Sequence, residues 1–327
     1  MSRFRLSVLV LGAFALMSSF VSASADIDTW EKHWPQTDFS RHSVDLSEII
    51  SGGIGRDVIP VIDEPTIGGL DKARQVHDPR EPVITVTVNG ETRAYPKTVL
   101  IWHEIVNDTL GGVPIAVTFC PLCNTSIVFD RRVGDAVLDF GTTGNLRFSD
   151  LVMYDRQTES WWQQFTGQGI VGAYSGEDLT IIPSRVEPFG VFAERVPDAD
   201  ILERPPLFAR NYGVNPYAGY DTADAPFMPG VPAVEGIAPL AYVVAVGDQA
   251  WSLDLLRKEQ KIETGDLVIT WESGLLSVLD LAYIKESRDI GYVTVQRRTV
   301  EGLQDAAHDM TSAFAFNAFH PDGTLHQ

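Results

Sequence analysis

Apolar and polar residues alternate over much of this chain, with the period of two that is typical of β-strands. The clearest example is VITVTVNGETRAY at residues 83–95, where two alternating runs flank Asn89-Gly90. An Asn-Gly pair between such runs is a strong hairpin signal, because both residues readily adopt positive φ. The pattern predicts a hairpin here, and short strands with turns through most of the chain.

A second pair of apolar, β-branched runs surrounds the only two cysteines of the chain. Residues 114–130 read PIAVTFCPLCNTSIVFD. This pattern predicts a hairpin whose tip is the turn Cys120-Pro-Leu-Cys123. If the protein carries out chemistry, this tip is the first candidate for its site.

Between the two hairpins, the sequence predicts a helix over 97–107. Pro96 suits the first turn of a helix, because its fixed φ is already helical. Val99, His103 and Val106 would then share one face, together with apolar residues. We therefore expect His103 to point into the core.

A similar order of elements recurs later in the chain. Residues 244–251 alternate as residues 86–95 do, and in both places a helix and then a strand are expected. The agreement in order favours an internal duplication. In the second copy, residues 272–275 read Glu-Ser-Gly-Leu at the position of the cysteine turn, so only the first copy would carry a site.

Together these patterns predict a mainly β protein with a few short helices. Two related hairpin-helix-hairpin units would pack as one globular domain. The expected segments are a signal peptide (1–25), an N-terminal strap (26–82), a first β unit with the cysteine turn (83–182), a Pro-rich irregular connection (183–235), and a second β unit with the C-terminal segment (236–327).

The N-terminus has the pattern of a secretory leader. Arg3 and Arg5 precede an apolar run over 6–21, and Ala23-Ser24-Ala25 has the small-x-small form of a cleavage site. The run is short for a membrane span. We expect a periplasmic or secreted protein with no stable membrane insertion after cleavage.

The formal net charge of −19 limits the classes of partner that the protein can bind. Nucleic acid and anionic lipid both require cationic surface, so neither is expected. No nucleotide cofactor is expected either. An unidentified small molecule or an envelope protein remains as the partner.

Three interpretations compete for Cys120 and Cys123. A structural disulfide would close a very short ring and would therefore stabilise little. A redox dithiol of the thioredoxin kind requires a helix after the turn, whereas residues 124–130 indicate a strand. The third interpretation is half of a metal site, because such a turn presents two sulfurs to one ion.

A metal site needs further ligands, and histidine is the natural donor. His103 is the first candidate, followed by His320 and then His308. A Cys₂His₂ set would suit one zinc or cuprous copper ion. A Cys₂His set with an open position would be catalytic or would transfer metal.

Several motifs resemble those of a bacterial family of proteins named for domain of unknown function 3179 (DUF3179). The motifs are TFCPLCNTSIVFDR, FGTTGNL, LVMYDRQTESWW and FHPDG, and the resemblance covers about residues 45–325. It implies an exported or envelope protein and supplies no established activity. It also suggests that the cysteine turn, His103-Glu104, two Asp-Arg pairs and the terminal His-Pro belong to one pattern. Asn124 stands where glycine is usual, and the turn can accept it because asparagine tolerates positive φ.

Other candidates lie at strand ends. Asp130-Arg131 and Asp155-Arg156 could orient an anionic group, but we favour ion pairs that pin strand ends. Trp161 and Trp162 would face opposite sides of a strand, so at most one could be a stacking platform.

Three functions therefore remain open. The first is a periplasmic metal-binding protein, and the second is a metal-free thiol-disulfide oxidoreductase. The third is a non-enzymatic envelope binding module, whose contact surface would be the tryptophans and the loop at 205–232.

Overall fold

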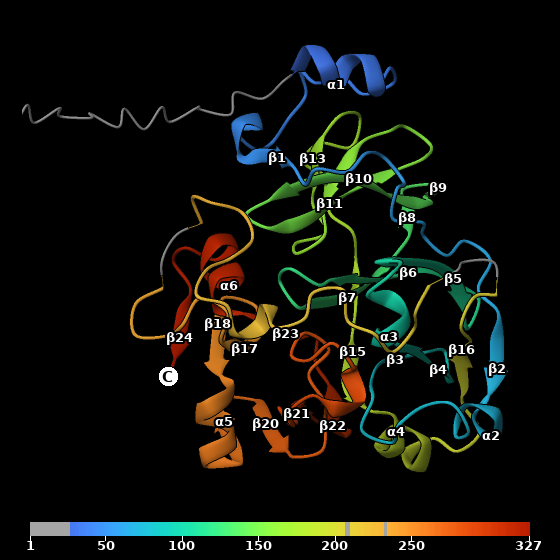
Figure 1. Ribbon diagram of the computed structural model, residues 1–327, viewed down its shortest axis with the longest axis vertical. Coiled ribbons are helices and arrows are strands. Elements are labelled where there is room, and N and C mark those ends of the chain that lie inside the picture. The colour runs from blue at the N-terminus through green and yellow to red at the C-terminus, as the bar shows by residue number, and fades with distance from the viewer. Residues whose placement is uncertain (1–26, 207–209, 232–233) are drawn as a thin grey trace, which may run out of the picture.

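The computed structural model describes residues 27–206, 210–231 and 234–327, and the signal peptide expected over 1–25 lies outside them. The fold is mainly β with short helices, as expected, and small sheets form one compact domain. Figure 1 shows three groups of strands: the first unit at the right, the second unit at the lower left, and a further sheet above the first unit.

The first unit contains two sheets. Their strand orders are β15-β3-β4-β16-β2 and β14-β7-β6-β5. The strands are β2 (Ile67–Gly69), β3 (Pro82–Val88), β4 (Glu91–Pro96), β5 (Ile105–Leu110), β6 (Val113–Cys120), β7 (Thr125–Asp130), β14 (Ile181–Ile182), β15 (Ser184–Pro188) and β16 (Asp200–Leu202). The hairpin β3-β4 turns at Asn89 (φ 51°) and Gly90 (φ 85°), as the sequence predicts.

The second unit also contains two sheets, in the orders β23-β17-β18-β24 and β19-β20-β21-β22. The strands are β17 (Tyr242–Val246), β18 (Gln249–Ser252), β19 (Lys261–Thr264), β20 (Leu267–Glu272), β21 (Tyr292–Thr299), β22 (Gly302–Asp305), β23 (Asp309–Ser312) and β24 (Thr324–His326). After the first hairpin come the helices α3 (Lys97–Leu100) and α5 (Leu253–Glu259), one in each unit.

The two units share one strand topology. Each has a central hairpin with an antiparallel strand on one side, β15 or β23, and a parallel strand on the other, β16 or β24. A helix links these outer strands in both units, α4 (Phe189–Arg195) and α6 (Ala313–Phe319). Strand β23 packs on β7 of the first unit, and β15 packs on β21 of the second. Descent from a duplication stays a prediction.

A five-stranded sheet is built from four strands inserted into the first unit between β7 and β14 and from one strand of the N-terminal strap. It contains β1 (Ile49–Ser51), β10 (Phe140–Arg147), β11 (Asp150–Asp155), β12 (Trp161–Gln163) and β13 (Gly169–Val171), and the small hairpin of β8 (Arg132–Val133) and β9 (Ala136–Val137) precedes β10. The second unit has no such sheet among its described residues. The N-terminal helix α1 (Ile27–His33) lies over the inserted sheet, where Trp30 and Trp34 contact the Trp161 ring (Figure 1).

The helix predicted over 97–107 is wrong in length. Helix α3 ends at Leu100, and β5 begins at Ile105. Glu104 has φ 60°, which no helical residue adopts, and the β-branched residues that follow pair with β6. His103 therefore lies in the turn between helix and strand, although it is fully buried as expected.

The segment 183–235 is less irregular than its prolines indicate. Its first third holds β15, α4 and β16. Pro188 is compatible with this order because it stands at the N-cap of α4, where a missing N–H costs nothing. The irregular part begins after Leu202 and contains a single 3₁₀ turn at Tyr220–Thr222 within its described residues.

The largest apolar cluster is common to both units. It joins Ile84 and Val117 of the first unit to Val244 and Val295 of the second. A second cluster lies between the first unit, the inserted sheet and α6, and it includes both cysteines. The cysteine turn is thus placed where three parts of the fold meet.

Candidate metal centre

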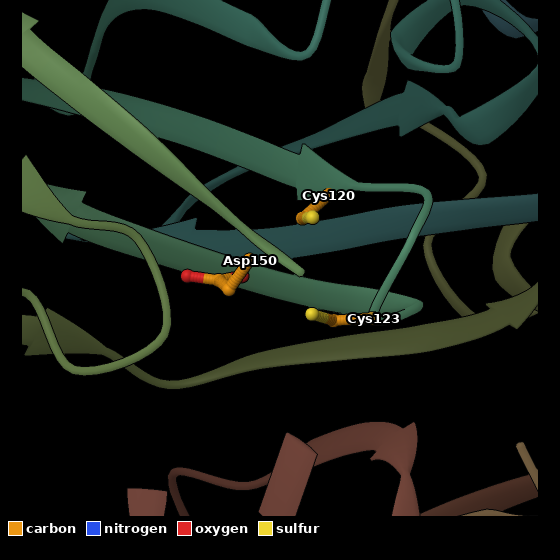
Figure 2. A group of neighbouring side chains, drawn as sticks. All are labelled: Cys120, Cys123 and Asp150. Atoms are coloured by element: carbon orange, nitrogen blue, oxygen red, sulfur yellow. The ribbon is translucent and has the colours of Figure 1, made fainter. Parts of the chain in front are cut away.

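The structure brings two cysteines and one aspartate together. Cys120 is the last residue of β6, Cys123 lies in the turn before β7, and Asp150 is the first residue of β11. The two sulfurs and one carboxylate oxygen all lie within 4.8 Å of one another, and all three residues are buried. Figure 2 shows the three side chains grouped at the tip of the hairpin.

The turn geometry explains why both sulfurs are on the same side. Cys120 pairs with Thr125 across the hairpin, so only four residues connect the two strands. Asn124 closes the turn with φ 56°, as expected for an asparagine in the place of glycine. Both cysteines are free thiols.

Asp150 reaches the thiols because of the turn before it. Phe148 and Ser149 both have positive φ, 52° and 62°, a strained conformation for such residues. This turn also points the carbonyl oxygen of Ser149 at the thiols, 3.3 Å from Cys123 Sγ and 3.8 Å from Cys120 Sγ. Strained backbone that survives in a buried turn is typical of functional sites.

The two carboxylate oxygens of Asp150 have different environments. Oδ2 accepts hydrogen bonds from Gln163 Nε2 at 2.6 Å and from the backbone N–H of Phe165 at 2.9 Å. Oδ1 is buried and makes no hydrogen bond of standard geometry with the described part of the chain. Burial raises the pKa of the Asp150 carboxyl, and the thiols of Cys123 and Cys120 lie close enough to lower that pKa in part. A buried oxygen without a well-formed hydrogen bond is costly, and a cation would satisfy Oδ1.

The second unit holds the cysteine turn in place. The carbonyl oxygen of Cys123 accepts hydrogen bonds from Ser312 N at 2.9 Å and from Thr311 Oγ1 at 3.0 Å. The amide of Asn124 donates to the carbonyl oxygen of Met310 at 3.1 Å. All three partners belong to β23, so the centre requires both units.

The irregular segment after Leu202 covers the centre. The backbone N–H of Met228 donates to Ser149 Oγ at 2.9 Å. Burial raises the pKa values of Tyr217 and Tyr220, and the nearby cysteines raise both further. These two tyrosines therefore lie close enough to the cysteines for a thiolate to affect their pKa values.

Burial disfavours the charged form of each acidic group at the centre. Burial raises the pKa of Asp150 to about 7 and that of Glu104 to about 8, and the Asp150 carboxylate raises the latter further. Burial also raises the pKa values of both thiols, most strongly that of Cys123. Without a cation, burial therefore favours the protonated form of each of these groups.

Lys97 is a buried cation beside the cysteine turn. Its ammonium group donates to Asn124 Oδ1 at 3.0 Å and lies 4.0 Å from the centre of the Phe119 ring. Burial lowers the pKa of Lys97 to about 7, although the carboxylate of Asp309 opposes the shift. The lysine thus stabilises the turn through its hydrogen bond to Asn124.

Among the described residues, the histidines expected as ligands are not members of the group of Cys120, Cys123 and Asp150. The ring nitrogens of His103 contact the carbonyl oxygen of Pro60 (2.6 Å) and the hydroxyl of Tyr212 (2.8 Å). His320 stacks on Phe316 and is not a member of the Cys120–Cys123–Asp150 group. His308 donates a hydrogen bond of 2.8 Å from Nδ1 to the carbonyl oxygen of Ala306. The structure thus offers Asp150 as the third ligand.

In the two Asp-Arg pairs, the aspartate and the arginine each interact with a different residue and not with each other. Asp130 pairs with Arg132, and Arg131 pairs with Asp139. Arg156 Nη1 lies 2.8 Å from Asp63 Oδ2. Asp155 accepts hydrogen bonds from Thr158 N at 2.7 Å and from Trp162 Nε1 at 2.9 Å. These contacts fix strand ends, and none reaches the thiols.

Trp161 and Trp162 face opposite sides of β12, and both are fully buried. Trp161 packs with the N-terminal strap, whereas Trp162 packs in the cluster that contains the cysteines. Neither ring is exposed to stack on a ligand from solvent.

Sequence reasoning missed Asp150. It follows Phe148-Ser149, and no spacing to a cysteine marks it as a ligand, because its sheet is inserted after the hairpin. The only local signal is an acid at the start of an otherwise apolar strand, Leu151–Tyr154.

The comparisons with known proteins give a family. The sequence profile described as a protein of unknown function (DUF3179) matches residues 56–323, and the chain belongs to this family. No curated protein and no solved structure matches the chain. Within the described residues, the helices are all too short or too polar to cross a bilayer.

Proposed function

We propose that this member of the DUF3179 family is an exported metalloprotein that binds one zinc ion through Cys120, Cys123 and Asp150. The observation that carries the proposal is the grouping of two buried free thiols with the Asp150 carboxylate, whose buried Oδ1 makes no hydrogen bond of standard geometry within the described residues. Two thiolates and a carboxylate are ordinary zinc ligands.

The donor set favours zinc over cuprous copper. Cuprous copper is selected by soft thiolate and thioether ligands, whereas zinc also accepts carboxylate oxygen. Asp150 adds a hard donor to the two sulfurs, and its second oxygen is fixed by Gln163 and Phe165. Such outer hydrogen bonds orient a ligand and are typical of metal sites.

Three protein ligands leave a fourth position on a tetrahedral ion, as in catalytic zinc sites. A zinc ion with such an open position would bind a water molecule there and lower the pKa of that water. Glu104 is buried beside Asp150 and Cys120, and it is the residue suited to hold or move a proton there. These features support a catalytic or metal-transferring role for the centre.

The thiol-disulfide alternative has weaker support. Disulfide exchange requires an accessible thiolate of lowered pKa. Cys120 and Cys123 are 2% and 0% exposed, and burial raises the pKa of both thiols. A binding module that uses Trp161 and Trp162 as its surface has no support, because both are buried.

Export is proposed from the sequence of residues 1–25, which has the charged, apolar and small-x-small regions of a leader. A zinc centre with buried thiols is compatible with an oxidising compartment, because bound and buried cysteines resist oxidation. Fractionation of cells that produce the full chain tests this part: the mature protein should be recovered outside the cytoplasm and begin near Asp26.

The metal content of protein purified under reducing conditions tests the centre. We expect about one zinc per chain, lost in Cys120→Ser and in Asp150→Asn. Asp309→Asn is the matched control, because Asp309 is also a buried acid and does not belong to the group. His103→Gln separates the ligand sets: it should retain zinc if Asp150 is the third ligand.

Cobalt substitution gives an independent readout. Cobalt bound by two thiolates absorbs in the near ultraviolet through sulfur-to-metal charge transfer, and this band should vanish in Cys123→Ser. Wild-type protein that binds neither zinc nor cobalt, or Asp150→Asn protein with full zinc content, would contradict the proposal. Metal-free protein that exchanges disulfides would favour the oxidoreductase instead.

A further inference from the structure

A cavity of about 230 Å³ lies where the two units meet, outside the metal centre. It is bordered by β7 and β14 of the first unit and by β17, β23 and the end of α6 of the second. We propose that this cavity binds a small, uncharged, mostly apolar organic molecule that carries a hydroxyl group. Neither cysteine nor Asp150 lines it.

The walls of the cavity are mainly apolar. Ile127, Phe165, Ile182 and Ala245 contribute the surface, and Ile181, which is 41% exposed, lies at the side open to solvent. Apolar cavities of about 150 Å³ in other proteins bind benzene. A cavity of this size and lining is therefore sufficient for one substituted ring.

Two imidazoles supply acceptors. His308 lies with Nδ1 2.8 Å from the carbonyl oxygen of Ala306, so Nδ1 carries the proton and Nε2 is an acceptor. His320 is fixed by ring contacts with Phe316 and Phe165. Burial lowers the pKa values of both histidines, which keeps them uncharged near neutral pH.

The end of the cavity at Asp309 carries further acceptors. Asp309 accepts a hydrogen bond from Ser126 N at 2.9 Å through Oδ1, while its Oδ2 is buried and makes no hydrogen bond of standard geometry with the described chain. Ser126 Oγ, which lies in the adjoining small cavity with Asp309, is in the same situation. A molecule that donates a hydrogen bond is complementary to this end.

The charges near the cavity favour an uncharged ligand. The carboxylate of Asp309 and the acidic protein as a whole oppose an anion. The ammonium of Lys97, which interacts with Asp309, together with the apolar walls, opposes a second cation. A neutral hydroxyl compound avoids both costs.

The cavity and the metal centre are joined by one strand. Asp309 begins β23 at the cavity, and Thr311 and Ser312 end it at the carbonyl oxygen of Cys123. A ligand at Asp309 would thus lie one short strand away from the centre. The proposal itself does not depend on a bound metal.

Phenol, toluene and benzoate are the probes that test the inference, because they are similar in shape and differ in the substituent. Titrations by calorimetry or ligand-observed NMR should show millimolar or tighter binding of phenol. Toluene should bind about fivefold more weakly, as expected for one lost neutral hydrogen bond, and benzoate should not bind. His308→Phe or His320→Phe should reduce this preference for phenol.

A cavity-filling variant locates the binding. Ala307→Trp places a large ring at an exposed lining residue and should abolish phenol binding. Ala238→Trp is the matched control, because Ala238 is exposed and does not line the cavity. Thr166→Trp replaces Ala307→Trp if circular dichroism shows that the latter is unfolded. Absence of phenol binding to the wild type, equal binding of benzoate, or binding that survives the filling variant would overturn the proposal.

Discussion

The backbone N–H of Ser312 donates a hydrogen bond of 2.9 Å to the carbonyl oxygen of Cys123. Ser312 ends a strand of the second unit, whereas Cys123 belongs to the first. A cysteine turn on an isolated hairpin would be mobile, because a two-stranded hairpin is marginally stable in water. The second unit therefore fixes the position of sulfurs that it does not itself contribute.

Thr311→Val tests this support. The hydroxyl of Thr311 donates to the carbonyl oxygen of Cys123 and lies 3.0 Å from Thr125 Oγ1. Valine has the same shape but no hydroxyl, so Thr125 Oγ1 and the carbonyl oxygen of Cys123 each lose one hydrogen bond, and the free energy of unfolding should fall by about 1–3 kcal/mol. Zinc affinity should fall roughly tenfold, because the turn is less well fixed. Urea denaturation and a competitive zinc chelator measure the two effects.

The control for this change is Thr87→Val. Thr87 also contacts another threonine, Thr92, with 2.9 Å between the hydroxyl oxygens, but at the surface. Its replacement should change the free energy of unfolding by less than about 0.5 kcal/mol and leave zinc affinity unchanged. Equal effects of the two substitutions would show that the contact with Cys123 has no special role.

Asn124 contributes to the centre in two ways, and two substitutions separate them. Its side chain connects Lys97 to the carbonyl oxygen of Met310, and its backbone has φ 56°. Asn124→Gly loses only the hydrogen bonds, whereas Asn124→Ala also acquires the strain of a left-handed residue. Thermal or urea unfolding should place the alanine variant about 1 kcal/mol below the glycine variant. Equal stabilities would mean that the turn relaxes to another conformation.

The sequence predicts those parts of the fold that depend on local pattern. The hairpin at Asn89-Gly90 and the hairpin that carries Cys120 and Cys123 both follow from alternation and turn residues. In both hairpins, residues close in sequence determine the result. His103 is buried as predicted, although the helical face that predicts its burial does not form.

The parts that sequence does not predict depend on distant partners. Asp150 becomes a candidate ligand only because the inserted sheet folds back on the hairpin tip. Helix α3 stops at Leu100 because Ile105 and its neighbours pair with β6, and this strand pairing overrides the helical pattern. Strand β15 and helix α4 are not predicted, because the prolines of this segment suggest a loop. Pro188 is nevertheless compatible with the start of a helix.

The rate at which a reagent labels the thiols tests whether the irregular segment after Leu202 shields them from solvent. Tyr220 packs against the apolar cluster that contains the cysteines, and its hydroxyl accepts a hydrogen bond of 3.0 Å from Phe227 N. In metal-free wild type, a thiol reagent such as DTNB should react slowly, since both cysteines are buried and their thiol pKa values are raised. Tyr220→Ala should accelerate the reaction at least several-fold.

Tyr283→Ala is the control for labelling, because Tyr283 is 56% exposed and lies outside that cluster. It should leave the rate unchanged. Rapid labelling of the metal-free wild type would contradict the closed arrangement of the centre. Saturation with zinc should protect both thiols in the wild type and in both variants.

The buried acids predict how stability depends on pH in the metal-free protein. The pKa of Glu104 is raised from 4.5 to about 8, so between these values the folded state binds a proton that the unfolded state has lost. The stabilisation is fully present below pH 4.5 and is lost as pH rises towards 8. This group alone should lower the free energy of unfolding by roughly 1.4 kcal/mol per pH unit in that window. Asp150, with its pKa raised to about 7, acts in the same direction.

Glu104→Gln should therefore flatten this dependence, because glutamine does not titrate. Urea denaturation of chelator-treated protein at pH 5, 6, 7 and 8 measures the slope. Glu301→Gln, in the exposed turn between β21 and β22, should keep the wild-type slope. A Glu104→Gln slope equal to that of the wild type would show that Glu104 is ionised in the folded protein at neutral pH. It would then be a charged neighbour of the metal centre rather than a proton donor.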